Sequence, residues 1–577
     1  MTEHRLIPDS EMPNDRTHTE ITQLVESKFT DHRNKVRQSA LWAAYGDALG
    51  WISELTDEKG LRRRTKGATL HRPIEWKRRI GGRSGVTATL PQGCYSDDSQ
   101  LRLATGRSIR PEGFDVEMFS KVELPIWLSY ELGGGNSTKA AATNLARPRV
   151  QWFANTFKGW TNSGGNGAAM RIQPHVWASS DLNNPMTYLP DVVRNAICTH
   201  SHPNGLMGAV IHALTLAHAM HIGEPPSPDD LLTTIDVAAK IPDLIQDDFE
   251  VGIHWKSTFE RESEVFGDTW ALALSECTET IHAVADTSNE VGAARYAAIV
   301  DRLKLRNPSR RGSGMLTAIA AAGLAWCDSK PDSALRIAAN QLGTDTDTIA
   351  TMAGAILGVN TDEEPQVEVL DADLFKSENN RLSEIAWGGV PLSHTYPDLL
   401  HWSAPKARAD TLSQLDDGSL YVHGLGHAES LSEPISSPID EFMWQWVRLE
   451  IGQTLIIKRR RNVIRYRGEV ISPPINQPLD QIRQTASEST SHAKGNELKT
   501  ADVPSDNTKS SETLTKDQLG QPDIEAMIDY LEKHNYEDEN LGRAMRRVVN
   551  TCSSTQIAAF LSVVIERLRV SSNPTST

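Results

Sequence analysis

The feature that most constrains the fold is a series of helical segments rich in small residues, between about residues 35 and 360. In RQSALWAAYGDALGW, GLMGAVIHALTLAHAMHI and DTIATMAGAILG, apolar positions recur every three or four residues, which is the spacing of one helix face. Their many Ala and Gly residues suit helices that pack closely. We therefore expect a mainly α protein with a compact all-α domain over residues 35–365.

The segment after about residue 365 has a different pattern. In WQWVRLEIGQTLIIKRRRNVIRYRGEV, Val447 and Leu449 point one way and Arg448 the other, which is the two-residue period of a strand. Gly452 and Gln453 can form the turn of a hairpin. Residues 370–473 are therefore predicted to form a smaller β-containing domain.

The two ends of the chain and the stretch before the C-terminal part are polar. Residues 474–515 contain few large apolar side chains and are predicted to be a disordered linker. Helical patterning returns in PDIEAMIDYLEKHNYEDENLGRAMRRVV. The predicted order is a flexible lead-in over 1–34, the helical domain over 35–365, the β-containing domain over 370–473, the linker over 474–515 and a helical segment over 516–570.

Charge and cysteine content exclude several classes of protein. The net charge of −16 argues against a general binder of polyanions. The five cysteines form no CxxC pair, so neither a disulfide framework nor a structural zinc site is indicated. No run of about 18 apolar residues is present and the N-terminus lacks an apolar signal core, so we expect a cytoplasmic protein without a membrane partner.

A basic strip runs along the second half of the predicted hairpin. It could contact nucleic acid or an acidic partner, but no ladder of aromatic residues accompanies it, so a solvated strand face is the favoured interpretation. A partner for the C-terminal region is not identified by any motif. The strip consists of Lys458, Arg459, Arg460, Arg461, Arg465 and Arg467.

Three acidic motifs stand far apart in the sequence. Taken singly, each looks like a helix cap, because Ser, Thr and Asp accept hydrogen bonds from free N–H groups at a helix start. A cap needs one such residue, whereas these motifs supply several, and adjacent bare carboxylates repel each other. Together they offer enough hard oxygen ligands for two ions of the magnesium, manganese or calcium type. The motifs are GDALGWISE with Asp47 and Glu54, YSDDSQ with Ser96, Asp97 and Asp98, and GTDTDTIATMAGAILG with Asp345, Asp347 and Thr348.

Two further motifs lie between the acidic ones. SGGNGAAMRIQP, residues 163–174, can bring backbone N–H groups close to a phosphate, although a plain helix-start turn fits these residues equally well. THSHP places His200 and His202 just before a helix, where they could be metal ligands, hydrogen-bonding groups or polar surface. Zinc is disfavoured because no third nitrogen or sulfur ligand stands at a helpful spacing.

In this order, GDALGWISE, YSDDSQ, GNGAAMRIQP, THSHP and GTDTDTIATMAGAILG resemble the ADP-ribosylglycohydrolase family, which includes the dinitrogenase-reductase-activating glycohydrolase. The resemblance covers roughly residues 35–360 and implies a compact all-α fold. It also implies a pair of Mg²⁺ ions, with Mn²⁺ as an alternative. The residues implied to lie at the metals are Glu54, Ser96, Asp97, Asp98, Asp345, Asp347 and Thr348.

The resemblance also implies roles for individual residues. Glu54 matches the residue that activates the attacking water. From the chemistry of an oxocarbenium-like transition state, Asp97 and Asp98 are also expected to stabilise positive character at C1″. His200 matches a histidine near the phosphates or the ribose of the nucleotide. The loop that touches ADP-ribose corresponds to Ser163, Gly165, Asn166 and Gly167.

Two positions depart from the family pattern. Ser96 replaces the usual threonine, and it keeps the hydroxyl group. Thr344 stands between Gly343 and Asp345, where a second glycine is usual, so we expect an altered loop shape.

The function implied is hydrolysis of the C1″ glycosidic bond that joins ADP-ribose to a protein or another conjugate. Two alternatives use the same residues: a magnesium-dependent phosphohydrolase of nucleotide diphosphates, and an ADP-ribose-binding protein without turnover. The linkage and the target are left open by the sequence.

Overall fold

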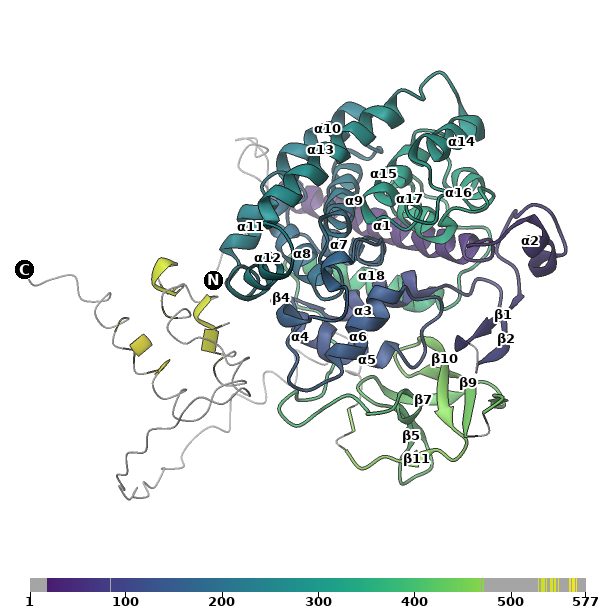
Figure 1. The fold of residues 1–577 in the computed structure, drawn as a ribbon, viewed down its shortest axis with the longest axis vertical. Helices are drawn as coiled ribbons and strands as arrows, with labels where there is room; N and C mark the ends of the chain where they lie inside the picture. The colour runs from purple at the N-terminus through teal and green to yellow at the C-terminus, as the bar shows by residue number, and fades with distance from the viewer. Residues whose placement is uncertain are drawn as a thin grey trace, which may run out of the picture. The chain divides into compact units, whose positions relative to one another are not determined.

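The computed structural model describes residues 18–82, 85–439, 441–468 and 470–471, together with short runs and single residues between 528 and 567. The chain divides into two units, Met1–Pro474 and Ile475–Thr577, and Figure 1 labels helices and strands of the first. In the first unit a series of helices precedes a sheet, which confirms the predicted mainly α fold with a following β region. The described residues of the second unit are mostly helical. The predicted linker over 474–515 lies outside the described residues.

The helices form the core of the first unit. Several begin with a capping side chain or with a proline in the first turn, and both features deal with the free N–H groups of a helix start. The first helix begins at His18, so the predicted lead-in is helical over residues 18–34. The helices are α1 His18–Gly50, α2 Glu58–Thr65, α3 Asp97–Arg107, α4 Val116–Met118, α5 Leu124–Trp127, α6 Asn136–Leu145, α7 Gln173–Trp177, α8 Leu189–Ile197, α9 Pro203–Ile222, α10 Pro228–Ala238, α11 Ile241–Asp247, α12 Ser257–Glu262, α13 Phe266–Ala285, α14 Gly292–Leu303, α15 Gly314–Ala325, α16 Pro331–Ala339, α17 Thr346–Gly358 and α18 Ala372–Ala386.

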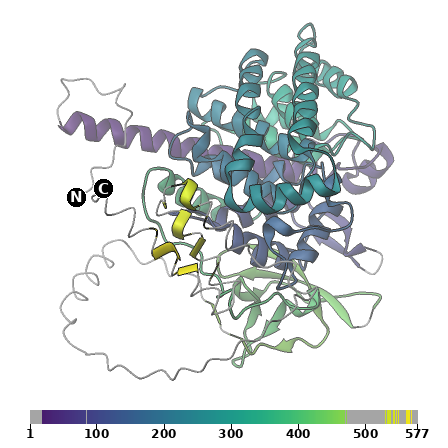
Figure 2. The same cartoon turned by 60° about the vertical axis from the view of Figure 1, so that its left-hand side comes forward.

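Helices α1 and α17 touch along their backbones. A Cβ atom on Gly46 would lie 2.3 Å from the carbonyl oxygen of Ala350, and one on Gly354 would lie 2.3 Å from that of Trp42. Only glycine allows such an approach. The two helices run antiparallel, so the end of α1 lies beside the start of α17. Figure 2 shows α1, in purple, running into the helical part of the unit.

Helices α9 and α15 form a second close pair. A Cβ atom on Gly208 would lie 2.2 Å from the carbonyl carbon of Gly314. By length and composition alone, α9 is apolar enough to cross a membrane, but 83% of its most apolar window is buried inside the protein. This burial is typical of a core helix.

The region after α18 contains a seven-stranded sheet with the order β10-β9-β7-β6-β5-β11, and β8 pairs with β9. The predicted hairpin is confirmed: β9 and β10 are antiparallel, with Val447 opposite Leu455, and Gly452 in the turn has a φ of 97°. The strands are β5 Leu412–Gln414, β6 Leu420–Val422, β7 Gly426–Ser430, β8 Ile435–Ser436, β9 Phe442–Leu449, β10 Thr454–Arg460 and β11 Ile464–Arg465.

Buried polar contacts join this sheet to the helices. Arg107 of α3 donates to both carboxylate oxygens of Glu123 and to Oε1 of Gln453, at 2.7, 2.8 and 2.7 Å. Asp371 accepts hydrogen bonds from the backbone N–H of Thr454 and from the hydroxyl of Tyr95, both at 2.7 Å. The sheet is therefore attached to the segment that leads into α3.

Two small hairpins inside the helical region were not predicted. Strands β1 Trp76–Ile80 and β2 Val86–Leu90 pair antiparallel, and so do β3 Ile109–Arg110 and β4 Gly113–Phe114. The β-branched residues of VTATL were a usable sequence signal for β2, because such residues favour strands, and alternate residues of β2 are buried. The first hairpin carries an arginine into the site described below.

Candidate active site

The close packing of α1 and α17 brings the first and third acidic motifs together. At the end of α1, a Cβ atom on Gly50 would lie 2.4 Å from the carbonyl oxygen of Thr346. The hydroxyl of Thr346 donates to the carbonyl oxygen of Gly50 at 2.8 Å. These contacts place the loop that carries Glu54 beside the first turn of α17.

The second motif is joined to both of the others. Asp47 of α1 is fully buried and accepts hydrogen bonds from the backbone N–H groups of Ser96 and Ser99, each at 2.9 Å. Thr348 of α17 donates to Oδ1 of Asp98 at 3.4 Å. Segments separated by up to 296 residues therefore meet at the N-termini of α3 and α17, where the helix dipole favours negative charge.

The carboxylates form a cluster with the geometry of a metal site. Oxygen atoms of Glu54, Asp345 and Asp347 all lie within 4.8 Å of one another. Oδ2 of Asp98 is buried and has no hydrogen-bond partner among the described residues. Asp97 lies next to Gly133, where a Cβ atom would be 2.9 Å from Oδ1. Converging carboxylates with an unpartnered buried oxygen fit a hard divalent cation.

The electrostatics of the cluster point the same way. Burial raises the pKa values of Asp97, Asp98 and Asp347 well above the ordinary value, and the neighbouring carboxylates raise them further. A bound cation would reverse this effect by favouring the charged forms. The residues present therefore fit a divalent metal ion.

The two hydroxyl residues implied as metal ligands also have local roles. Ser96 is the N-cap of α3, and its Oγ accepts a hydrogen bond from the N–H of Asp98 at 3.2 Å. Thr348 faces Asp98, as described above. Thr344, the unusual residue before Asp345, is buried and donates to the carbonyl oxygen of Gln341 at 2.7 Å. Its side chain is therefore accommodated by turning back along the chain, after Gly343 with a φ of 85°.

Glu54 has a partner that the sequence did not identify. Both terminal nitrogens of Arg78, from β1, donate to Oε2 of Glu54 at 3.1 Å. The Arg78 guanidinium also lies over the rings of Trp51 and Trp76, 5.0 and 5.8 Å from their centroids. Burial raises the pKa of Glu54, and the charge of Arg78 opposes that rise. The pair fixes one oxygen of the predicted catalytic carboxylate.

The Gly-rich loop is tied to the third acidic motif. Nδ2 of Asn166 donates to Oδ2 of Asp345 at 3.0 Å. Gly165 forms an isolated bridge with Ser313, just before α15. Ser163 is buried and its hydroxyl has no hydrogen-bond partner among the described residues. The loop predicted to contact the substrate thus lies against the carboxylate cluster.

The two histidines of THSHP differ in their surroundings. Nδ1 of His200 lies 2.7 Å from the hydroxyl of Thr199, and its ring faces Gly167, where a Cβ atom would be 3.0 Å from Cε1. Burial lowers the pKa of His200 to about 3, so the ring is neutral at physiological pH. His202 instead caps α9 by accepting from the N–H of Asn204 at 3.1 Å. Both histidines therefore lie against the Gly-rich loop, His200 at Gly167 and His202 at Gly164, where a Cβ atom would be 3.1 Å from Nδ1 of His202.

A buried arginine holds this side of the site in place. Arg171 donates to the carbonyl oxygen of Gly167 at 2.8 Å and to the hydroxyl of Thr199 at 2.9 Å. It also donates to the side chain of Asn195 at 2.8 Å. No sequence pattern indicated this role, because Asn195 and Thr199 lie 24 and 28 residues along the chain from Arg171.

Comparison with known proteins adds a family match. A sequence profile described as ADP-ribosylglycohydrolase matches residues 29–364, which include every candidate site residue and end before α18. Among solved structures, one titled "ADP-ribosylglycohydrolase-related protein complex" is 19% identical, with a TM-score of 0.38. The match covers 62% of this chain and 99% of that one. No curated protein matches the sequence.

Proposed function

Since this chain belongs to the ADP-ribosylglycohydrolase family, we propose that it releases ADP-ribose from an ADP-ribosylated target by cleaving the C1″ glycosidic bond in a metal-dependent reaction. Members of the family are hydrolases that act on ADP-ribosylated substrates and generally use divalent metals. The observation that carries the proposal is the convergence of Glu54, Asp345 and Asp347 within 4.8 Å, beside Asp97 and Asp98.

The proposed metal ligands are the acidic residues at the starts of α3 and α17. Asp97, Asp98, Asp345 and Asp347 would hold Mg²⁺ or Mn²⁺, with Glu54 next to them and the hydroxyls of Ser96 and Thr348 as additional oxygen donors. A bound divalent ion would orient the ribose hydroxyls and stabilise developing negative charge. The support is chemical: the donors are all oxygens, and most are buried.

Glu54 is proposed to position the attacking water and to accept its proton. Both hydrogen bonds from Arg78 go to Oε2, so the carboxylate is held in one orientation with Oε1 outside that pair. The positive guanidinium opposes the rise that burial causes in the pKa of Glu54 and so favours the anionic form, which a general base requires. The sugar at the reacting centre would acquire oxocarbenium character, which the nearby Asp97 and Asp98 are placed to stabilise.

The Gly-rich loop and His200 are proposed to bind the ADP-ribose portion. The missing side chain at Gly167 makes room for the ring of His200, and backbone N–H groups of the loop can contact phosphate oxygens. Neutral His200 can donate one hydrogen bond without adding charge. Asn166 links this loop to Asp345, so binding of the nucleotide and orientation of the reacting ribose are connected.

A protein conjugate is favoured over nucleic acid as the target. On the basic strip of β10 and β11, Arg460 is paired with Asp410 and Glu441, and Arg465 lies 2.9 Å from Asp416. Acidic side chains thus neutralise these two arginines, whose positive charge would otherwise be available to bind phosphates. We further propose a cytoplasmic location.

The test offers the purified protein arginine-linked and serine-linked ADP-ribosylated proteins, with Mg²⁺ or with EDTA. We expect intact ADP-ribose to be released with Mg²⁺ only, and the Asp345→Asn/Asp347→Asn variant to lose this activity. Asp286→Asn is the matched control and should keep the activity, because it replaces an exposed aspartate that directly follows the last residue of α13.

The products distinguish the alternatives. AMP with ribose phosphate would identify a phosphohydrolase that uses the same carboxylates. Tight binding of ADP-ribose without any product, from either linkage, would contradict the proposed hydrolysis of those substrates and favour a binding protein.

A further inference from the structure

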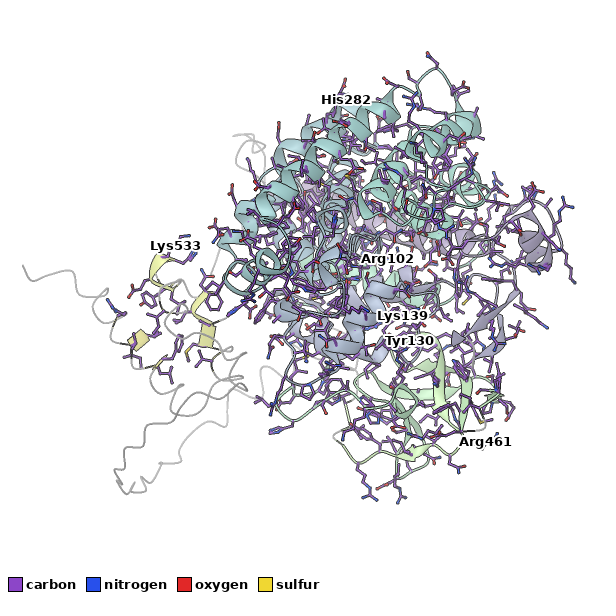
Figure 3. All side chains as sticks on the ribbon, viewed as in Figure 1. Arg102, Tyr130, Lys139, His282, Arg461 and Lys533 are labelled. Atoms are coloured by element: carbon purple, nitrogen blue, oxygen red, sulfur yellow. The ribbon has the colours of Figure 1, made fainter. Side chains whose placement is uncertain are left out.

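A buried arginine lies below the carboxylate cluster, outside every motif discussed so far. Arg102 is on α3, one turn after Asp98, and only 2% of it is exposed (Figure 3). Its terminal nitrogens donate to the hydroxyl of Thr351 at 2.8 Å and to that of Ser99 at 2.6 Å. Both partners are neutral.

Arg107, on the same helix, shows how different this arrangement is. Arg107 is also buried, but it donates to both oxygens of Glu123 and so forms a closed ion pair. No carboxylate hydrogen-bonds to Arg102 among the described residues.

Two carboxylates lie near Arg102, and one of them, Asp98, is a proposed metal ligand. Ser99 and Thr351, which accept hydrogen bonds from Arg102, lie within one turn after Asp98 and Thr348, which contact each other, and the backbone N–H of Ser99 also donates to Asp47. The charges of Asp47 and Asp98 oppose the fall that burial causes in the pKa of Arg102. Asp47 holds the first turn of α3 through two backbone N–H groups, and Asp98 carries the unpartnered oxygen Oδ2. A fixed cation therefore faces the carboxylates from inside the protein.

We infer that Arg102 is a built-in counter-cation, which keeps the acidic cluster assembled when no metal is bound and, for the same reason, weakens the binding of divalent cations. The inference rests on the proposed function, because it takes the cluster to be a metal site. Two cations that share one set of carboxylates repel each other, and in a buried site water screens this repulsion only weakly.

A counter-cation role and a purely structural role predict opposite changes in metal affinity when Arg102 is replaced. If Arg102 only held Ser99 and Thr351 in place, its removal would misplace Asp98 and weaken metal binding. If it acts as a counter-cation, removal of its charge tightens metal binding and destabilises the metal-free protein. The sign of the change in affinity decides between the two roles.

The experiment measures Mn²⁺ binding to metal-stripped full-length protein by electron paramagnetic resonance of free Mn²⁺. Arg102→Met and Arg102→Gln remove the charge, and glutamine keeps a donor for the two hydroxyls. We expect each to lower the Kd for Mn²⁺ by about tenfold. Arg102→Lys retains the charge and Thr351→Val removes only a hydrogen-bond partner, so both should bind Mn²⁺ with a Kd close to that of the wild type.

Thermal unfolding supplies a second readout. Without metal, Arg102→Met should unfold at a lower temperature than the wild type, and saturating Mn²⁺ should raise its Tm by more than it raises that of the wild type. If Arg102→Met does not fold without metal, Arg102→Gln and Arg102→Lys still form a matched pair that differs in charge.

Equal or weaker Mn²⁺ binding by the folded neutral variants would overturn the counter-cation role while leaving the proposed function intact. A wild-type protein that binds no Mn²⁺ would overturn the metal dependence itself, and this inference with it.

Discussion

Alanine at Gly50 would place a Cβ atom 2.4 Å from the carbonyl oxygen of Thr346 and 2.6 Å from the Cα atom of Asp347. Ordinary contact begins at 3.4 Å, so α1 and α17 would have to separate by about 1 Å at this point. Both obstructing atoms belong to the backbone, and no side-chain rotation can relieve the contact. The substitution would therefore move the first turn of α17, which carries Asp347 and Thr348.

Two magnitudes follow from this displacement. Overpacking of a close contact costs about 1–3 kcal/mol of unfolding free energy. A shift of about 1 Å in groups that must align with a substrate can reduce turnover by about 100-fold. We therefore expect Gly50→Ala to lose both stability and activity, and to bind Mn²⁺ more weakly than the wild type.

The assay compares three glycine-to-alanine variants by urea unfolding, Mn²⁺ titration and release of ADP-ribose. Gly354→Ala makes a similar clash, 2.3 Å from the carbonyl oxygen of Trp42, but lies about two turns from the carboxylates, so it should lose stability with a smaller loss of metal affinity. Gly267→Ala, in the first turn of α13, meets nothing within 4 Å and should be neutral or slightly stabilising. A Gly50→Ala variant with wild-type stability and wild-type Mn²⁺ affinity would refute the reasoning that backbone contact sets the position of the ligands.

Three further outcomes are expected. Asp98→Asn should weaken Mn²⁺ binding by at least about tenfold, yet stabilise the metal-free protein, because it removes one of several buried carboxylates that repel one another; calorimetric titration and thermal unfolding of the stripped protein check the two effects. Arg78→Met should lower kcat by about 10- to 100-fold with little change in KM, because Glu54 loses its orientation and its counter-charge; steady-state kinetics with an unchanged kcat would contradict this. Burial lowers the pKa values of His175 and His212 to about 3, so below about pH 6.5 the unfolded state binds protons that the folded state does not. Each histidine should then lower the free energy of unfolding by about 1.4 kcal/mol per pH unit as the pH falls from 6.5 towards 3. Urea unfolding of the His175→Gln/His212→Gln variant in Mg²⁺ should therefore show a weaker dependence on pH.

Much of the fold could be predicted because its signals are local. The three- to four-residue period of DTIATMAGAILG and the two-residue period of WQWVRLEIG each identify an element without reference to the rest of the chain, and both predictions are confirmed. The β1–β2 hairpin was missed because its strands are short, at five residues each, and lie between Gly-rich turns inside a helical region. The helical stretch from His18 was missed because its polar residues resemble those of a flexible segment.

The candidate site could likewise be predicted only in part from the sequence. The acidic residues could be singled out because hydroxyls and carboxylates crowd together at helix starts, more of them than capping requires. Their meeting in space depends on the glycine contacts between α1 and α17, which periodicity does not reveal. Arg78 and Arg102 were missed for a related reason, since an arginine in a strand or a helix is ordinarily a surface residue.

These two arginines explain how so many carboxylates can share one buried place. Asp97 and Asp347 lie in the first turns of α3 and α17, where free N–H groups favour negative charge. Arg78 comes from the β1–β2 hairpin and donates hydrogen bonds directly to Glu54. Arg102 lies in the helical core, where it donates hydrogen bonds to hydroxyl groups and acts on the carboxylates by its charge. The fold thus supplies part of the positive charge that the cluster needs, and a bound metal ion would supply the remainder. The two sources act on the same carboxylates, so the effect of removing a fixed cation on stability depends on whether the metal is present, and the two effects do not add.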